Sequence, residues 1–316
     1  MPGKNMSVSV NSSCAKCKRH SMRRQLPLHL MLIPALILVI IYCYIPMTGI
    51  IIAFQDFIPA KGLFGNQKWC GFENFTFVFG LPGTGKVIWN TVYISLMKII
   101  SGMLVPIIVS LLLNEVNVTW FKRSVQTLIY LPFFLSWVIF AGLLIDILSP
   151  SDGIVNRVMN LLGIPSVYFL GDAKVFPYTI VATDVWKNFG YNTIIFLATL
   201  TGIDPALYEA ARIDGANRWQ QTLHITLPGM ISIIVLIATL NIGNVLNAGF
   251  DQIYNLYSPQ VYSTGDVLDT FVYRLGILDA QYGVSTAVGL FKSAISCAFM
   301  SLSYYLAYRF ANYRIF

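Results

Sequence analysis

Long blocks of apolar residues constrain this chain more than any other feature of its sequence. A helix needs about 20 consecutive apolar residues to cross the hydrocarbon core of a bilayer. Six blocks reach that length, at about 30–54, 87–113, 124–149, 174–201, 229–248 and 285–308. Charged residues make up only 11% of the 316 residues, against about 25% in an ordinary soluble domain. The sequence therefore predicts an all-α integral membrane protein with six transmembrane helices.

Basic residues predict how these spans are oriented. The predicted cytoplasmic stretches together hold 12 Lys and Arg, and they are 1–29, 114–123, 202–228 and 309–316. The predicted external stretches hold 5, and they are 55–86, 150–173 and 249–284. Because Lys and Arg are in excess in short cytoplasmic loops, we expect both termini in the cytoplasm.

Residues 1–29 are predicted to be a basic cytoplasmic tail that precedes a transmembrane domain at 30–316. The tail carries six Lys and Arg and no acidic residue. No aromatic platform accompanies these charges, so we expect no nucleic-acid partner. Cys14 and Cys17, with His20 nearby, look like half of a zinc site, but a structural site needs four ligands and no second cysteine pair completes it. We therefore expect no bound metal.

The segment 202–228 is too polar to span a membrane, yet it has helical signals. Asp204 is a natural N-cap and Pro205 suits the first helical position. Leu207, Ala210, Ala211 and Asp214 then recur at helical spacing, and Gly215 is typical of a helix end. A second short helix is expected from Asn217, with Pro228 ending it and opening the next span. The pattern predicts two short helices lying crosswise on the cytoplasmic surface.

A helix that presents two alanines beside a carboxylate suits docking in a groove of a soluble partner. Because this helix joins two spans, movement of the partner would reach both. The alternative, a helix resting on lipid headgroups, calls for several basic residues. Only Arg212 and Arg218 are present, against Asp204, Glu209 and Asp214. The residues therefore favour docking, although Glu209 and Arg212 also have the spacing of a local ion pair.

These residues carry a family resemblance. Glu209-Ala210-Ala211, followed by Asp214-Gly215-Ala216 and Leu227-Pro228, resembles the EAA loop of permeases in binding-protein-dependent ABC importers. The longer string from Tyr208 to Gln220 is similar to the maltose-type carbohydrate subgroup. Further stretches resemble the branch that imports oligo- and polysaccharides in Gram-positive bacteria, and they are 44–57, 131–138, 240–247 and 287–293. The resemblance covers residues 27 to about 310.

The resemblance implies a type I ABC importer permease with six spans in a bacterial plasma membrane. It implies a heterodimer with a second homologous permease, two cytoplasmic ATPase subunits that bind ATP and Mg²⁺, and an extracellular solute-binding protein. The cargo would be an oligosaccharide or polysaccharide fragment. In the family, the residue matching Glu209 meets a basic residue of the ATPase and the one matching Gly215 allows the bend. Ala210 and Ala211 would supply the close-packing face beside Asp214.

Candidate substrate contacts lie inside the predicted spans. Aromatic faces and amides suit sugar rings, which offer apolar C–H faces and many hydroxyls. The candidates are Trp137, Trp186, Asn188, Tyr191, Asn241 and Asn244. Tryptophan and tyrosine are equally typical of interfacial belts, and amides of helix packing, so these alternatives stay open. Asp184 and Lys187, three residues apart, have the spacing of a local ion pair, and the alternative that they mark the pathway stays open.

Other function classes are less well supported by the residues. The run from Gly80 to Val87 resembles a P-loop, but Val87 lacks the hydroxyl that would hold Mg²⁺, so we expect no ATP bound by this chain itself. No catalytic constellation accompanies the three histidines, so we do not expect an enzyme. An ion-gradient-driven secondary transporter remains the alternative to an ATP-driven importer.

Overall fold

The computed structural model describes residue 27 and residues 29–311. The predicted basic tail up to residue 26, with Cys14, Cys17 and His20, lies outside the described residues. The main helices are the first span (His29–Phe54), which includes α2 (Ile45–Met47) and η2 (Thr48–Phe54), then α3 (Glu73–Gly80), α4 (Thr84–Glu115), α5 (Thr119–Tyr130), η4 (Leu131–Phe134), α6 (Trp137–Ile147), α7 (Ile154–Leu161), α8 (Phe176–Leu200), α9 (Pro205–Ile213), α10 (Arg218–Gln221), η5 (Thr222–Thr226), α11 (Leu227–Gly243), α12 (Phe250–Leu256), α13 (Tyr262–Gly265), α14 (Leu268–Tyr273) and α15 (Tyr282–Ala311). Two short strands, β1 (Gln55–Asp56) and β2 (Lys68–Trp69), pair antiparallel, Gln55 opposite Trp69.

Among the described residues, four helices are long and apolar enough to cross a membrane. They are His29–Phe54, Thr84–Glu115, Arg218–Gly243 and Tyr282–Leu306. Two bent pairs of helices pass the same test when taken together, which brings the number of spans to as many as six. The mostly helical, multi-span architecture predicted from the apolar blocks is therefore confirmed.

The third span differs from the single helix expected at 124–149. α5 with η4 and the following α6 are bent by 106°. The bend follows from local sequence: Pro132 opens a 3-10 turn, Leu135 is extended, and the Ser136 side chain accepts a hydrogen bond from the Ile139 amide and starts a new helix. The apolar pattern continues across this break, which is why it predicted one straight helix.

The expectation of two short crosswise helices is half wrong. α9 is short and meets α8 at 70°, as expected. The second helix is not separate, because α10, η5 and α11 form one helix from Arg218 to Gly243. Pro228 does not interrupt it: the preceding turn is a π turn, in which Leu227 N–H donates to the Thr222 carbonyl. The wider turn leaves room for the proline ring and tolerates the absence of a backbone N–H group on proline.

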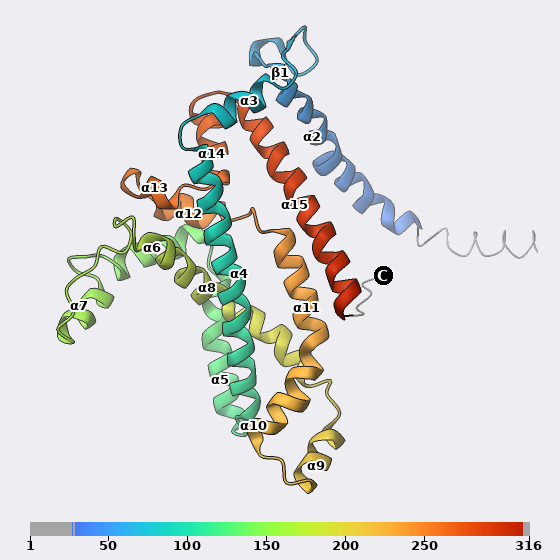
Figure 1. Cartoon of the computed structure of the whole chain (residues 1–316), viewed down its shortest axis with the longest axis vertical. Coiled ribbons are helices and arrows are strands. Elements are labelled where there is room, and N and C mark those ends of the chain that lie inside the picture. Colours follow the sequence, from blue (N-terminus) through green and yellow to red (C-terminus); the bar gives the residue numbers. More distant parts are fainter. Residues whose placement is uncertain (1–26, 28, 312–316) are drawn as a thin grey trace, which may run out of the picture.

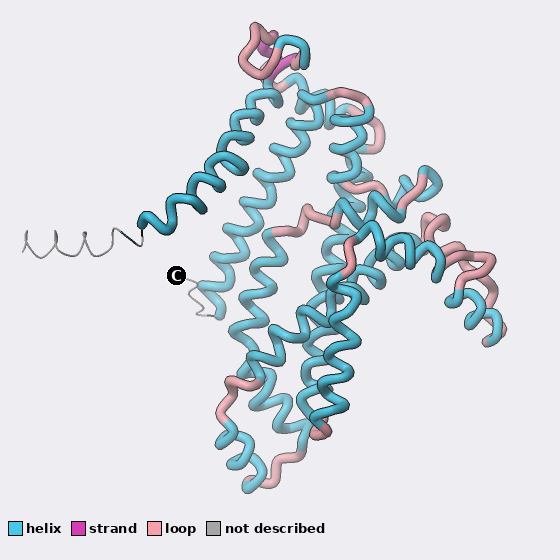
Figure 2. The backbone as a smooth tube through the Cα atoms, turned by 180° about the vertical axis from the view of Figure 1, so that it is seen from behind, coloured by secondary structure: helices cyan, strands magenta, loops and turns pink. Residues whose placement is uncertain are grey.

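The helices pack along their length through three buried clusters, and α4 lies against α8 (Figure 1). α8 also approaches α5 closely at Gly190, where an added Cβ would lie 2.0 Å from the Ile129 carbonyl oxygen. The first span is different. None of its most apolar window is buried, and its N-terminal part extends away from α15 in both views (Figures 1 and 2).

The two ends of the molecule carry different segments. α9 and α10 lie at one end, together with the turn between α4 and α5 (Figure 1). The β1–β2 hairpin and α3 lie at the opposite end. The predicted external loop 55–86 and the predicted cytoplasmic loop 202–228 are thus at opposite ends of the fold.

Candidate functional site

The helix α9 is built by the capping residues that the sequence predicted. The Asp204 carboxylate accepts a hydrogen bond of 2.9 Å from the Ala206 amide, and Pro205 is the first helical residue. At the other end Gly215 has φ +81°, and the Ala216 amide donates to the Ala211 carbonyl at 2.8 Å. This is a glycine-terminated helix end, in which the left-handed residue closes the last turn. The predicted helix and its stop are confirmed.

Two side-chain contacts connect this segment to the spans. The Tyr208 hydroxyl of α9 lies 3.0 Å from the Thr226 hydroxyl, just before α11. Arg218, at the start of the helix that continues into α11, donates to Glu115 at the end of α4 over 3.0 Å. α9 is therefore joined to α11 by a side-chain contact and to α8 through the chain.

The outer face of α9 is unpartnered in the described part of the chain. Glu209 and Ala210 are exposed, and neither Glu209 nor Arg212 has an ion pair with any described residue. The local Glu209–Arg212 pair is thus not formed. Glu209 instead lines a cavity of about 250 Å³ between α9 and the ends of α4 and α10. A carboxylate at an open cavity mouth is accessible to a basic group of a partner.

The remaining coupling residues lie on the other side of α9. Ala211, Asp214 and Gly215 line a second cavity, of about 330 Å³, toward α10 and η5. Ile213 is 88% exposed, a residue that sequence reasoning missed. Its signal was an isolated aliphatic side chain between Arg212 and Asp214. A helix with an exposed isoleucine between two hollows has the form of a docking element.

A cavity lined by several polar side chains opens beside α8, and Tyr191, Asn244 and Asn247 on its wall are exposed. It has a volume of about 390 Å³ and is bounded by α4, α8 and the end of α11. Its carboxamide side chains come from Asn188, Asn192, Asn241, Asn244 and Asn247. One wall is aromatic, because Phe133 and Tyr191 stack with ring centres 4.3 Å apart and planes inclined by 6°. We call this the central cavity.

Four of the six predicted pathway residues border the central cavity, namely Asn188, Tyr191, Asn241 and Asn244. The other two, Trp137 and Trp186, do not. Both pack on Phe140, a fully buried residue of the core, with ring centres 5.7 and 5.2 Å away. The amides of α8 and α11 meet because α11 ends beside α8, a juxtaposition that spacing within one span does not reveal.

The charges beside the central cavity are neutralised within the chain. Lys98 of α4 lies 3.4 Å from Asp184 of α8 and donates to the Ala248 carbonyl at 2.7 Å. Lys98 also donates to the Gln252 side-chain oxygen. The local pair between Asp184 and Lys187 is therefore not formed: Asp184 turns to a lysine of another helix.

The comparisons with known proteins agree with this geometry. Residues 114–312 match the family described as the binding-protein-dependent transport system inner membrane component, which is more than half of the chain. The chain belongs to this permease family. It is thus a permease subunit of an ABC importer and a multi-pass protein of the cell membrane, and the secondary-transporter alternative is wrong.

Individual relatives of the permease match nearly its whole length. The polygalacturonan/rhamnogalacturonan transport system permease protein YteP of Bacillus subtilis is 38% identical over 92% of this chain and 90% of its own. Protein LplB of the same organism is 38% identical over 94% and 93%. A chain of a bacterial alginate ABC transporter, crystallised with an alginate pentasaccharide-bound periplasmic protein, superposes with a TM-score of 0.85. The alginate transporter chain is 35% identical to the permease, and the match covers 94% of the permease and 99% of the alginate transporter chain.

Lys187 of the permease holds the bend of the third span. Its ammonium group donates to the carbonyls of Pro132, Phe133 and Leu135, over 3.2, 2.9 and 2.7 Å. The residue is only 5% exposed, and the ring of Trp137 lies 5.3 Å from its nitrogen. The Pro132 carbonyl also accepts the Leu135 amide within the 3-10 turn, at 3.3 Å, so Lys187 adds a second donor there and supplies a donor to the Phe133 and Leu135 carbonyls. Sequence reasoning missed this role because the carbonyls are more than 50 residues away in the chain.

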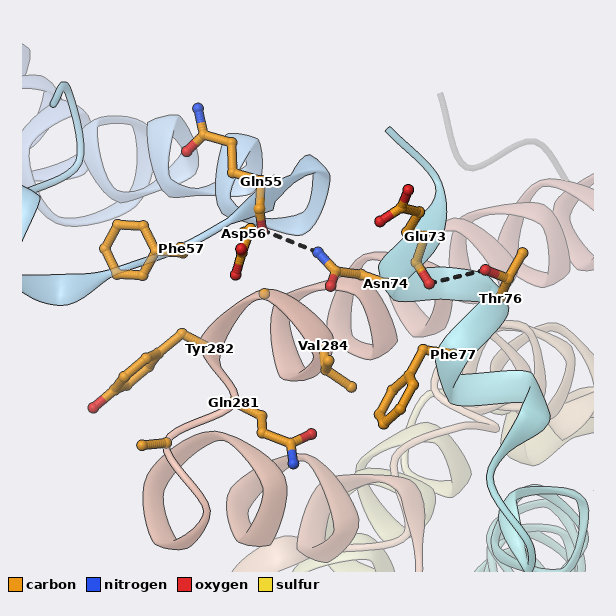
Figure 3. A pocket seen from close by; sticks show the side chains of 12 residues that line it. Gln55, Asp56, Phe57, Glu73, Asn74, Thr76, Phe77, Gln281, Tyr282 and Val284 are labelled. Carbon is orange, nitrogen blue, oxygen red and sulfur yellow. Dashed lines mark hydrogen bonds between the residues drawn. The ribbon is translucent and has the colours of Figure 1, made fainter. Parts of the chain in front are cut away.

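A second large cavity opens at the opposite end from α9. It has a volume of about 700 Å³ and is lined by three separate segments, 55–57, 73–77 and 280–284 (Figure 3). Asn74 joins them by donating to the backbone carbonyls of Ala53 and Gln55, over 2.9 and 3.1 Å. Gly283 lets α15 approach, because an added Cβ would lie 2.8 Å from the Asn74 amide nitrogen. This cavity of the permease was not predicted, since its walls are far apart in the sequence.

Proposed function

We propose that this permease imports oligosaccharides or polysaccharide fragments, driven by ATP hydrolysis on two cytoplasmic ATPase subunits that dock on α9. The observation that carries the proposal is the unpartnered face of α9, with Glu209 at an open cavity and Ile213 almost fully exposed. An isoleucine left in water and a carboxylate without a cation are stabilised when a complementary groove covers them.

The coupling path follows from the contacts of α9. Closure of the ATPase dimer moves α9, the Tyr208–Thr226 contact transmits this movement to α11, and the chain itself transmits it to α8. α8 and α11 both border the central cavity. The docked element and the walls of the pathway are therefore mechanically connected, and the spans switch from inward-facing to outward-facing.

The chemistry of the central cavity supports a saccharide as cargo. Carboxamides donate and accept hydrogen bonds, as sugar hydroxyls do, and an aromatic wall such as the Phe133–Tyr191 stack suits the C–H face of a pyranose ring. The lysine that lines this cavity, Lys98, is already paired with Asp184. The relatives named for polygalacturonan/rhamnogalacturonan transport and for alginate import support the same class of cargo.

The proposal includes four kinds of partner. A second homologous permease would cover the first span, whose apolar window is entirely unburied. Two ATPase subunits would bind ATP and Mg²⁺, and a solute-binding protein would deliver cargo at the end that carries the β1–β2 hairpin. Both termini would then be cytoplasmic, on the side of α9, with membrane lipid around the spans.

The test is uptake by the reconstituted complex in proteoliposomes. The permease is assembled with its second permease, ATPase and binding protein, and labelled oligosaccharides of galacturonan, rhamnogalacturonan and maltose type are offered with and without internal ATP. We expect uptake of at least one series only with ATP. Uptake driven by an ion gradient without ATP, or no saccharide uptake at all, would overturn the proposal.

Docking is tested separately by cysteine cross-linking along 207–214. Cysteines on the exposed positions, including Ile213, should capture the ATPase subunit. Capture of lipid alone would contradict the docking role of α9.

A further inference from the structure

Five aromatic rings form a continuous row on the short helices that follow α11. Phe250 stacks on Tyr254 with ring centres 5.2 Å apart. Tyr273 of α14 lies 5.3 Å from Phe250 and 4.9 Å from Tyr254. Beyond Tyr254 come Tyr257, at 6.2 Å, and then Tyr262, 4.9 Å from Tyr257. We call these five residues the aromatic row.

The aromatic row begins at the rim of the central cavity. Gly249 borders the cavity, and Phe250 is the next residue. The opposite face of α12 fixes its position: Gln252 is fully buried and donates to the Ile180 carbonyl at 2.8 Å. Tyr254 lies on the other side of the helix and is 40% exposed. The row thus leads outward from the cavity along the accessible side of α12.

Two tyrosines of the aromatic row have a raised pKa. The hydrogen bond from the Tyr254 hydroxyl raises the pKa of Tyr273 above its ordinary value. Burial, followed by the interaction with Tyr262, raises the pKa of Tyr257. A tyrosine hydroxyl is already protonated at physiological pH, because its ordinary pKa is about 10, so the O–H groups beside these apolar ring faces do not depend on the shifts.

The far end of the row carries a paired charge. The Arg274 guanidinium lies 4.8 Å from the centre of the Tyr262 ring and forms an ion pair with Asp266. Ring faces alternating with hydroxyl groups match a pyranose chain, whose rings have apolar faces and a hydroxyl edge. A purely lipid-facing surface would have no need of continuity with a cavity lined by five carboxamides.

We propose that the aromatic row is a binding track for the pyranose rings of an oligosaccharide, along which the chain passes between the external end and the central cavity. The inference rests on the proposed saccharide cargo and adds a site outside the cavity. Sugar rings stack on the ring surface that stays accessible, above all that of Tyr254, and the hydroxyls exchange hydrogen bonds with them as the chain advances. A longer oligosaccharide contacts more of the row than a disaccharide does.

The test compares chain lengths in the proteoliposome assay. The probes are the disaccharide and hexasaccharide of whichever series the wild-type complex imports. In Tyr254→Ala, the ratio of the hexasaccharide KM to the disaccharide KM should rise about three- to tenfold over wild type. Tyr254→Phe, which keeps the ring, should restore most of that ratio.

The matched control is Tyr178→Ala. Tyr178 is 57% exposed and its hydroxyl is bonded to that of Tyr93 at 3.1 Å, so it resembles Tyr254 but lies outside the row. Its KM ratio should equal that of wild type. An unchanged ratio in Tyr254→Ala would overturn the track alone, whereas failure of the wild-type complex to import any saccharide would overturn the proposed cargo first.

A photoreactive group identifies what covers the row. With p-benzoylphenylalanine in place of Tyr254, illumination during uptake should attach the labelled hexasaccharide to the permease, and excess unlabelled hexasaccharide should prevent this. Attachment only to the second permease, to the binding protein or to lipid would overturn the track.

Discussion

Lysines inside the spans have partners within the permease, whereas Glu209 and Arg212 on α9 have no ion-pair partner among the described residues. Lys98, Lys187 and Lys292 each meet acceptors from other parts of the permease. Glu209 and Arg212, at the end of the molecule, have no ion-pair partner among the described residues. An unpaired charge in the bilayer carries a large free-energy cost, whereas an unpaired charge at the surface is solvated by water. The permease itself therefore supplies the partners of these span lysines, whereas Glu209 and Arg212 are open to a partner, as the proposed docking of an ATPase requires.

The largest expected effect comes from removing an interior charge. Lys187→Met removes the ammonium donor from the carbonyls of Pro132, Phe133 and Leu135, of which Pro132 keeps the Leu135 amide, and should destabilise the permease by about 3 kcal/mol. Thermal unfolding of the purified protein, followed by fluorescence, measures the loss. Lys174→Met, at an exposed position, is the control and should unfold as wild type does. Equal stability of both variants would show that the bend does not depend on Lys187.

Adding a methyl group at Gly190, where α8 packs closely on α5, should have the next largest effect. An added methyl group meets the Ile129 carbonyl at 2.0 Å, so Gly190→Ala must push α5 from α8 and should cost about 2 kcal/mol. Gly142→Ala in α6 has no atom within 4 Å of the added methyl and should be harmless. The same unfolding measurement compares the two, and a neutral Gly190→Ala would mean that the close approach is not required.

On α9 the expected effect is on transport and not on stability. Glu209→Ala should lower ATP-dependent uptake at least about tenfold, because it removes the carboxylate that is proposed to pair with a basic group of the ATPase. The unfolding temperature should stay at the wild-type value. Asp152→Ala, which removes an exposed acid from a surface pair with Arg157, serves as the control for charge loss. Wild-type uptake in Glu209→Ala would contradict a role of Glu209 in docking the ATPase.

The smallest effect tests the backbone of the coupling segment. Gly215 has φ +81°, and no atom lies within 4 Å of the position that an added methyl group would take, so conformation alone opposes substitution. Gly215→Ala should cost about 1 kcal/mol and lower uptake several-fold, whereas Gly215→Asn should stay closer to wild type, since asparagine tolerates this region better. Equal uptake by the two variants would argue against a left-handed residue at this position.

Sequence reasoning succeeded where local chemistry decides structure. The block at 87–113 became Thr84–Glu115, and the signals at Asp204, Pro205 and Gly215 gave the ends of α9 almost to the residue. It failed where the outcome depends on distant contacts. Lys187 donates to carbonyls at the bend after Pro132 from more than 50 residues away, and the amides of α8 and α11 border one cavity only when both helices are in place.

A second kind of failure came from treating proline as a stop. Pro228 was expected to separate a short helix from the fifth span, but the π turn Thr222–Thr226 carries the helix past it. Such a turn has no strong composition signal, since it depends on which carbonyl the Leu227 amide reaches. The aromatic wall was missed for a similar reason, because Phe133 becomes a neighbour of Tyr191 only once the third span has bent.

The uninterrupted helix from Arg218 to Gly243 has a mechanical consequence. Its first turn adjoins α9, and 23 residues later Asn241 borders the central cavity, about 35 Å away at 1.5 Å per residue. If the proposed docking of the ATPase turns this helix, the Asn241 amide at its far end turns with it. Under that proposal, the orientation of a side chain at the cavity depends on the nucleotide state of the ATPase.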